Sequence, residues 1–362
     1  MGWLLGCVTV VEPTALKAFQ RLKVAVLMGG YSAERDISLA SACQVVLALR
    51  RLGHQVRAVD TARGWLTKEQ EEVLFQVGVS RTYPPEQQAR CGVPAWLSLP
   101  GDFTPDLWFL ALHGGAGEDG RMQGLLEMTG IPYTGSGVLG SSVAMDKDVS
   151  KRLLRLAGVP TADWCMAPVS ERGVEKALGW PVVVKPSKQG STVGLSVVRA
   201  PEQLAAAIAL AYGYDDEVMV ERFISGRELT GPVLGDAALT VGEIVLQRGE
   251  IFDYEAKYQP GGALEVFPAD LPVAVTAEVQ RLALLAHQTL KLKGYSRADF
   301  RLDAQGRLWC LEVNTLPGLT AMSLVPQAAA AQGMSFDVLV DQLCEQALSK
   351  ASTTLAAMSN PV

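Results

Sequence analysis

The sequence has 362 residues and a formal net charge of -6, and 49% of its residues are hydrophobic while 19% are charged. This length predicts two or three domains, each able to bury a core, in an ordinary globular protein. No basic arm or patch is present, which argues against a nucleic-acid partner. Six scattered cysteines without a CxxC pair and three isolated histidines argue against a disulfide scaffold and a His/Cys metal site. Any metal is therefore expected on oxygen ligands.

Residues 1–22 are interpreted as an N-terminal extension. The stretch MGWLLGCVTVVEP is apolar over much of its length, but it has no basic region. It is also too short to cross a bilayer, which requires about 20 apolar residues. No other segment is a membrane candidate, so we expect a cytoplasmic protein without a membrane partner.

Residues 23–138 predict an α/β domain. The expected elements are strands at 23–28, 55–59 and 107–112 and a helix at 37–52. Strands that alternate with helical patterns are typical of this class. The stretch from 61 to 103 has few periodic signals and predicts a variable connection with some helix.

Two α+β domains are expected to follow, at 139–221 and 222–349. The first is expected to hold helices at 147–156 and 201–212 and strands at 181–185, 195–198 and 217–220. The second is expected to hold strands at 241–245, 251–254, 296–302 and 307–313 and helices at 277–292 and 336–348. Gly231-Pro232 is expected to interrupt a strand as a bulge or an edge. Residues 350–362 are interpreted as a frayed tail.

An acidic hairpin is predicted near the C-terminus. Arg297, Asp299 and Arg301 alternate with apolar residues, as in a strand with one buried face. After a turn, Trp309, Leu311 and Val313 are assigned to one face of the next strand, and Glu312 and Asn314 to the other. The hairpin can then set Asp299 beside Glu312 and Asn314, and three oxygen donors suit a magnesium ion that also binds phosphates and water. The alternative is a solvent-facing polar edge.

Two lysines and a glycine loop indicate a site for an anion. Lys185 ends an apolar strand, and the loop 190–194 that follows offers backbone N–H groups and the Ser191 hydroxyl. Lys147 begins a helix and is a weaker candidate of the same kind. The loop lacks the order of a Walker P-loop. An ordinary flexible hairpin loop is the alternative.

A third pattern suits a nucleotide base. An apolar strand reaches Glu221, crosses Phe223-Ile224 and comes to Glu228, so that apolar side chains could hold adenine and a carboxylate could meet ribose hydroxyls. The GxGxxG match at 135–140 is rejected as a dinucleotide site. No acidic residue closes a second strand about 20 residues later, as that fold requires.

Together these segments resemble the ATP-grasp superfamily, and within it most closely the D-alanine–D-alanine ligases. The resemblance extends from Lys23 to about Leu348 and rests on motifs in the family's order. These motifs are GGYSAERDIS, ALHGGAGEDG, PYTGSG, MDK, VVKPSKQGSTVG, DYEAKY and EVNTLPGLT. The resemblance implies a three-domain ATP-grasp architecture with an α/β N-terminal domain.

The resemblance also implies a role for each matching residue. Glu34 and His113 would meet the first D-alanine, with Ser191 and Tyr258 holding Glu34 and closing a loop over the site. Arg297 and the backbone at Gly318 would stabilise the oxyanion, and Ser323 and Leu324 would meet the second D-alanine. The expected ATP contacts are Lys147, Lys185, Lys257, Glu221, Phe223, Ile224 and Glu228, and the expected ligands of two Mg²⁺ (or Mn²⁺) are Asp299, Glu312 and Asn314. Structural alternatives are a helix cap for Glu34, a turn histidine for His113 and a core aromatic for Tyr258.

The implied reaction joins two D-alanine molecules through an acyl phosphate, releasing ADP and phosphate and supplying the dipeptide for peptidoglycan. A tyrosine at position 258 is expected to favour an amine over D-lactate as second substrate. A homodimer is expected from the family alone. The alternatives are an ATP-grasp ligase with other amino-acid substrates and a nucleotide-binding regulatory module without catalysis.

Overall fold

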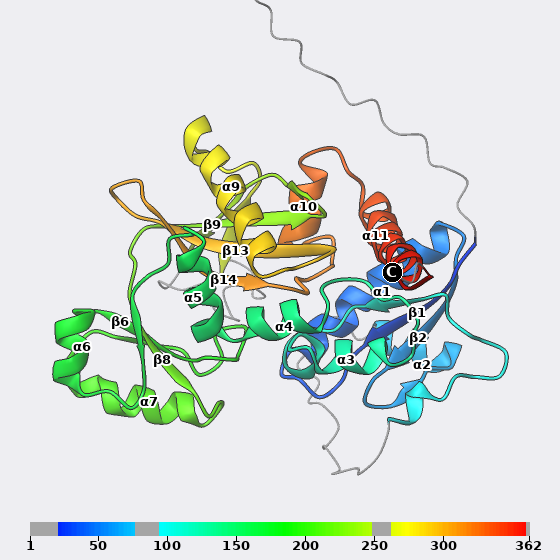
Figure 1. Ribbon diagram of the computed structural model, residues 1–362, viewed down its shortest axis with the longest axis horizontal. Coiled ribbons are helices and arrows are strands. Elements are labelled where there is room, and N and C mark those ends of the chain that lie inside the picture. The colour runs from blue at the N-terminus through cyan, green and yellow to red at the C-terminus, as the bar shows by residue number, and fades with distance from the viewer. Residues whose placement is uncertain (1–20, 77–93, 248–261, 360–362) are drawn as a thin grey trace, which may run out of the picture.

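The computed structural model describes residues 21–76, 94–247 and 262–359. These residues form three sheets with helices packed on them (Figure 1). In Figure 1 the sheet of β1 and β2 lies at the right and that of β6 and β8 at the left, with α4 and α5 in the region between them. The predicted combination of α/β and α+β parts is confirmed.

The first sheet has the order β3-β2-β1-β4, with β2 and β4 parallel to β1 and β3 antiparallel to β2. Residues 24–28 of β1 have no exposed surface, which explains why the run is apolar throughout rather than alternating. Its strands are β1 (Lys23–Met28), β2 (Gln55–Asp60), β3 (Gly64–Trp65) and β4 (Leu107–Leu110). Its helices are α1 (Arg35–Arg51), α2 (Lys68–Gln76), η1 (Ala95–Leu97), η2 (Gly115–Gly117) and α3 (Arg121–Glu127).

The second sheet is antiparallel and has the order β5-β8-β6-β7. The alanine-rich helix α7 packs on it because its small side chains approach the strand valines closely. The strands are β5 (Trp164–Met166), β6 (Val182–Pro186), β7 (Ser196–Val198) and β8 (Val218–Arg222). The helices before and around it are α4 (Val138–Met145), α5 (Lys147–Leu156), α6 (Glu171–Ala177), η3 (Pro201–Gln203) and α7 (Leu204–Tyr212).

The third sheet has the order β12-β11-β9-β13-β14, with β10 on β9, and α9 packs against it. Pro232 does not interrupt β9, contrary to expectation. On one side of β9, strand β11 pairs only as far as Thr230 and β10 only from Val233, so the missing N–H of Pro232 lies where the neighbouring strand changes. The elements are β9 (Arg227–Leu234), β10 (Ala237–Ala238), β11 (Gly242–Leu246), β12 (Ala263–Val266), α9 (Val273–Thr289), β13 (Tyr295–Leu302), β14 (Leu308–Asn314) and α10 (Leu324–Ala330).

The last helix, α11 (Phe336–Ser359), returns to the first sheet. Its residues Leu339, Val340 and Leu343 are buried in the same core as β1 and β4, and Arg51 on α1 bonds Asp337 at 2.6 and 2.9 Å. Figure 1 shows α11 beside α1. The helix was expected to end at 348 but continues to 359, because residues 349–359 contain no glycine or proline to stop it. Among the described residues, no helix has the length and apolar character needed to cross a membrane.

Candidate active site

The hairpin of β13 and β14 brings the predicted oxygen donors together. Asp299 lies opposite Glu312, and Arg297 lies opposite Asn314. One part of the prediction is wrong: Leu308, Cys310 and Val313 face the core, not Trp309 and Leu311 with Val313. The register shifts after Asp299, so that Leu311 is an extra residue without a partner in the ladder. Such a bulge reverses which side chains face inward on either side of it.

Asp299 is almost completely buried and is held by three neighbours. It accepts hydrogen bonds from Thr230 at 2.8 Å, from two guanidinium nitrogens of Arg297 at 2.8 and 2.9 Å, and from the Asn314 amide nitrogen at 3.1 Å. Because that nitrogen faces Asp299, the amide oxygen of Asn314 points elsewhere. Glu312 is 30% exposed at its side chain and lies 3.2 Å from the Lys147 ammonium.

This donor set fits a hard cation such as magnesium. Two carboxylates and an amide oxygen are ligands that Mg²⁺ accepts, and the partial exposure of Glu312 leaves access for phosphate and water. Within the described residues no three histidine, cysteine, aspartate or glutamate side chains gather as a metal site.

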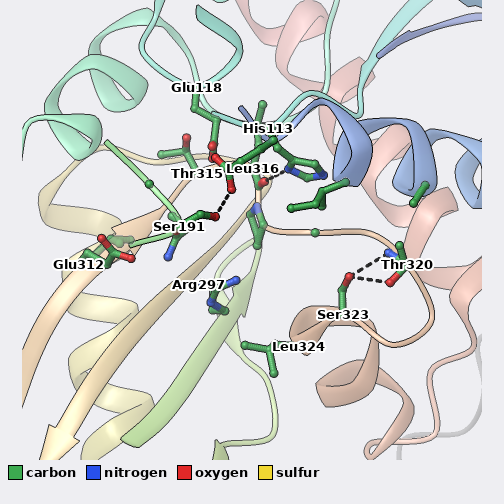
Figure 2. A pocket seen from close by; sticks show the side chains of 18 of the residues that line it. His113, Glu118, Ser191, Arg297, Glu312, Thr315, Leu316, Thr320, Ser323 and Leu324 are labelled. Carbon is green, nitrogen blue, oxygen red and sulfur yellow. Dashed lines mark hydrogen bonds between the residues drawn. The ribbon is translucent and has the colours of Figure 1, made fainter. Parts of the chain in front are cut away.

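A cavity of about 510 Å³ opens beside the hairpin, between the first and third sheets. Figure 2 shows His113 and Glu118 above it, Ser191, Arg297 and Glu312 toward the left, and Thr320 and Ser323 at the right. Residues from all three predicted domains therefore line one space. The predicted residues that line it are Glu34, His113, Lys147, Ser191, Arg297, Glu312, Asn314, Gly318, Ser323 and Leu324.

Glu34 is held toward this cavity from two sides. It precedes α1, but its side chain makes no cap hydrogen bond there, so it does not act as the helix cap considered above. Its carboxylate instead accepts a short hydrogen bond from Ser191. Gly114, with φ +68°, lies so close that a Cβ there would be 2.4 Å from the Glu34 carboxylate. Only glycine therefore fits at that turn.

The loop that carries Ser191 is strained. Ser191 and Thr192 have φ of 51° and 58°, a left-handed backbone that side chains with a Cβ rarely adopt. Each such residue costs roughly 1–3 kcal/mol and persists where the surroundings enforce it, often at functional sites. In this backbone conformation the Ser191 hydroxyl donates its hydrogen bond to Glu34.

His113 is buried and both ring nitrogens have partners. Nδ1 lies 2.8 Å from the Leu316 carbonyl and must carry the proton, so Nε2 accepts from the Ser41 hydroxyl at 2.9 Å. Burial lowers the His113 pKa, although the Glu34 charge opposes this. The neutral ring therefore lines the cavity in a fixed position. Its hydrogen bonds join the segment of His113 to α1 and to the loop after β14.

Arg297 and the loop after β14 form the opposite wall. Arg297 on β13 lines the cavity, and its guanidinium donates a hydrogen bond to Asp299. Gly318 abuts Ser323, whose hydroxyl accepts from the Thr320 amide at 3.1 Å and contacts the Thr320 hydroxyl at 2.8 Å. Leu324 is buried at the start of α10. The loop therefore places hydroxyl and backbone groups beside the Arg297 guanidinium.

A second cavity of about 120 Å³ lies between the second and third sheets. It is lined by apolar side chains, among them Phe223, Ile224 and Leu311, and by charged ones. The two cavities share Lys147, Gln189, Gly190 and Glu312. Lys147 is almost buried at this junction, where it bonds the Gln189 carbonyl at 2.6 Å. The predicted residues that line the second cavity are Lys147, Lys185, Glu221, Phe223, Ile224, Glu228, Asp299 and Glu312.

Two acidic residues that line the second cavity form ion pairs that were not predicted from the sequence. Glu221 is buried between Lys185, at 2.6 Å, and Lys151, with which it forms a short ion pair. Burial would raise the Glu221 pKa, but the two ammonium groups outweigh it and hold the pKa below its ordinary value. Glu228 pairs with Arg301 at 3.0 Å. Lys257 and Tyr258 lie outside the described residues.

Comparison with known proteins identifies the family. A family model described as the D-ala D-ala ligase N-terminus matches residues 23–136, and one described as the D-ala D-ala ligase C-terminus matches residues 153–345. The chain belongs to the D-alanine–D-alanine ligase family.

Individual relatives agree with this assignment. The chain is 40% identical to a D-alanine–D-alanine ligase of Synechococcus sp. (strain JA-3-3Ab) over 93% of its length and 97% of the relative's. It is 43% identical to that of Nitratidesulfovibrio vulgaris (strain DP4) over 91% of its length and 99% of the relative's. The structure of the Bacillus anthracis ligase complexed with ATP superposes with a TM-score of 0.70 at 27% identity, covering 92% of this chain and 99% of that one. The predicted ATP-grasp fold and ligase class are confirmed.

Three polar residues of this ligase were not singled out from the sequence. Lys151 lies four positions after Lys147 on α5, and that spacing places both on one helix face. Glu118 belongs to the motif that contains His113. Arg301 was assigned to the polar face of the hairpin, but its partner was not foreseen. Spacing could have drawn attention to all three, although it could not have supplied their partners.

Glu118 is half-buried against the same cavity wall in this ligase. It accepts from the Gly114 amide at 2.7 Å and the Leu316 amide at 3.0 Å. Burial, together with the nearby Glu34 charge, raises the Glu118 pKa to about 8 despite these two bonds. The Glu118 carboxyl therefore keeps its proton to a higher pH than an ordinary glutamate does, and the Glu34 carboxylate nearby is bonded to Ser191.

The raised pKa of Glu118 predicts a pH-dependent stability. The folded state keeps a proton that the unfolded chain loses above the ordinary value of 4.5, so the stabilisation is complete below that value and is lost as pH rises through about 8. We expect the melting temperature to fall more between about pH 6.5 and about pH 9 in the wild type than in Glu118→Ala. Equal falls in a calorimetric scan of the two proteins would contradict this.

Proposed function

We propose that the chain condenses two D-alanine molecules with ATP in the two connected cavities, and that the dipeptide supplies peptidoglycan synthesis. The observation that carries this proposal is the junction at Lys147, Gln189, Gly190 and Glu312, which belongs to both cavities. A carboxylate bound in the larger cavity and a triphosphate bound in the smaller one would meet there. The smaller cavity, lined by the apolar side chains of Phe223 and Ile224 and by Lys147 and Lys185, suits a nucleotide.

Glu34 is assigned to the ammonium of the first D-alanine. Its carboxylate faces the cavity, is aligned by Ser191 and is flanked by the fixed ring of His113. A carboxylate near a substrate ammonium supplies charge-assisted hydrogen bonds, which are stronger than neutral ones. The substrate carboxylate would then extend toward Lys147 and Arg297.

The chemistry needs charge neutralisation and positioning more than proton transfer. Attack of a carboxylate on the γ-phosphate joins two anions, forms an acyl phosphate and expels ADP. The second D-alanine, held through Ser323 and Leu324, would then attack the acyl carbon with its amine and expel phosphate. Arg297 and the backbone at Gly318 are assigned to the oxyanion of that tetrahedral intermediate.

Asp299, Glu312 and Asn314 would hold two magnesium or manganese ions. Bound there, such ions would supply charge neutralisation for the triphosphate. Lys147 and Lys185 would add cationic groups from the protein on the same side. Lys257 and Tyr258 keep their assigned roles at the γ-phosphate and in the lid as part of the proposal. We further propose a cytoplasmic location and a homodimer, as expected for the family.

The experiment that tests this function measures phosphate release with magnesium ATP and D-alanine as the sole amino acid. Release that depends on D-alanine, with formation of the dipeptide, is expected. Release only with a different amino acid would favour another ATP-grasp ligase. Nucleotide binding without any release would favour a regulatory module.

A further inference from the structure

A buried cluster of four polar side chains lies behind the second cavity. Lys151 from α5 contacts the hydroxyl of Thr161 and one carboxylate oxygen of Glu221 on β8, and Lys185 from β6 contacts the other oxygen at 2.6 Å. The side chains of Lys151 and Glu221 are only 1% and 3% exposed. Two cations and one anion therefore share a region with almost no water.

Glu221 lies between the two lysines, and Lys185 is the lysine on the cavity side. Lys185 and Glu221 line the second cavity, whereas Lys151 does not. The Trp164 ring lies 4.9 Å from the Lys151 ammonium and adds a cation–π contact. Lys151 contacts Thr161, Trp164 and Glu221 and does not line the cavity, so the contact that links it to a bound ligand is the one with Glu221.

We propose that Lys151 is a positioning residue for the nucleotide. It neutralises the Glu221 carboxylate on the side away from the cavity, so that the positive charge of Lys185 stays available to the phosphates. This inference rests on the assignment of the second cavity to the nucleotide. Without Lys151, Glu221 and Lys185 would form a closed neutral pair, and a phosphate would compete with the carboxylate for the same ammonium. In a site with little water this competition is costly.

The charge of Lys151 itself depends on the cluster. Burial lowers the Lys151 pKa, and the Glu221 carboxylate opposes that effect. The two residues therefore keep each other ionised. This mutual dependence explains why a lysine is tolerated in a buried position that faces no solvent.

The test uses Lys151→Met, which retains most of the length of the side chain and removes its charge. The readout is the ratio of ADP affinity to adenosine affinity, both measured by isothermal titration calorimetry on the full chain. Because only ADP carries phosphates, we expect ADP binding to weaken roughly 10- to 100-fold and adenosine binding by less than about twofold. Lys176→Met on the exposed face of α6 is the matched control and is expected to leave both affinities unchanged.

A double variant separates charge balance from packing. Lys151→Met combined with Glu221→Gln removes one charge of each sign, so the ADP-to-adenosine ratio is expected to return to within about threefold of that of Glu221→Gln alone. The same comparison tests the inference if Lys151→Met alone does not fold. A ratio that stays low in the double variant would overturn the inference.

Other outcomes are equally decisive. If Lys151→Met weakens adenosine as much as ADP, or weakens neither, the inference is wrong. Lys185→Met is measured in parallel and is expected to lower the ADP-to-adenosine ratio. An unchanged ratio in Lys185→Met would overturn the nucleotide assignment, and the inference with it. A lowered ratio in Lys185→Met with wild-type binding in Lys151→Met would overturn the inference alone.

Discussion

Replacing Glu312 with glutamine is expected to lower the rate of D-alanine-dependent phosphate release by about a thousandfold, which corresponds to about 4 kcal/mol of transition-state stabilisation. Glu312 belongs to both cavities, and its carboxylate is one of only two in the proposed metal site. Glutamine retains the shape but not the charge that a divalent cation requires. Because the side chain is 30% exposed and Lys147 retains its bond to Gln189, the melting temperature should change little.

Two measurements distinguish loss of the metal from other damage. Manganese titration followed by electron paramagnetic resonance, with ADP present, should show weaker binding in Glu312→Gln. Glu243→Gln is the matched control, because Glu243 pairs with Arg227 on the same sheet but lines neither of these cavities. Wild-type manganese affinity and turnover in Glu312→Gln would refute the assignment.

The elements with local signals were predicted closely. The prediction for α5 matches the structure at both ends, since Asp146 caps the helix by accepting from the Val149 amide and Gly158 follows its last turn. β1 likewise agrees, because a continuous apolar run before two glycines is typical of a buried parallel strand. In both cases the decisive interactions lie within a few residues along the chain.

The wrong predictions concern features that depend on contacts between residues far apart in the sequence. The period-two assignment of β14 failed at Leu311, because a bulge inserts one residue and nothing in the local sequence marks it. The packing of α11 on the first sheet joins it to α1 and β1, which are far away in the sequence. Local patterns carry no information about either contact.

In the candidate site, too, local sequence signals were informative and long-range contacts were not predicted. Glu312 and Lys147 were singled out from motifs and strand alternation, and the structure shows that both line the junction of the two cavities. The pairing of Glu221 with Lys151 was not predicted, since it joins residues 70 positions apart. Glu221 was assigned to the nucleotide, and the structure shows that its carboxylate is first engaged by two lysines. The sequence could thus single out Glu221 as a candidate, whereas its electrostatic partners required the fold.

Replacing Arg297 with lysine is expected to lower kcat by roughly 10²- to 10³-fold while ADP affinity stays within about threefold of wild type. Arg297 extends into the larger cavity and grips Asp299 through two guanidinium nitrogens. Lysine retains the charge but cannot bond the carboxylate with a planar fork and face the substrate at the same time. Steady-state kinetics and calorimetric ADP titration measure the two effects.

Arg301→Lys provides the matched comparison, because Arg301 lies two residues further on the same strand. Arg301 lines the smaller cavity and pairs with Glu228 there, so its replacement should raise the KM for ATP and change kcat less. If Arg297 served only to hold the strand, the two variants would instead lose stability and activity in parallel. Opposite kinetic signatures from two arginines on one strand would show that the cavities have separate roles, since a shared structural defect cannot produce them.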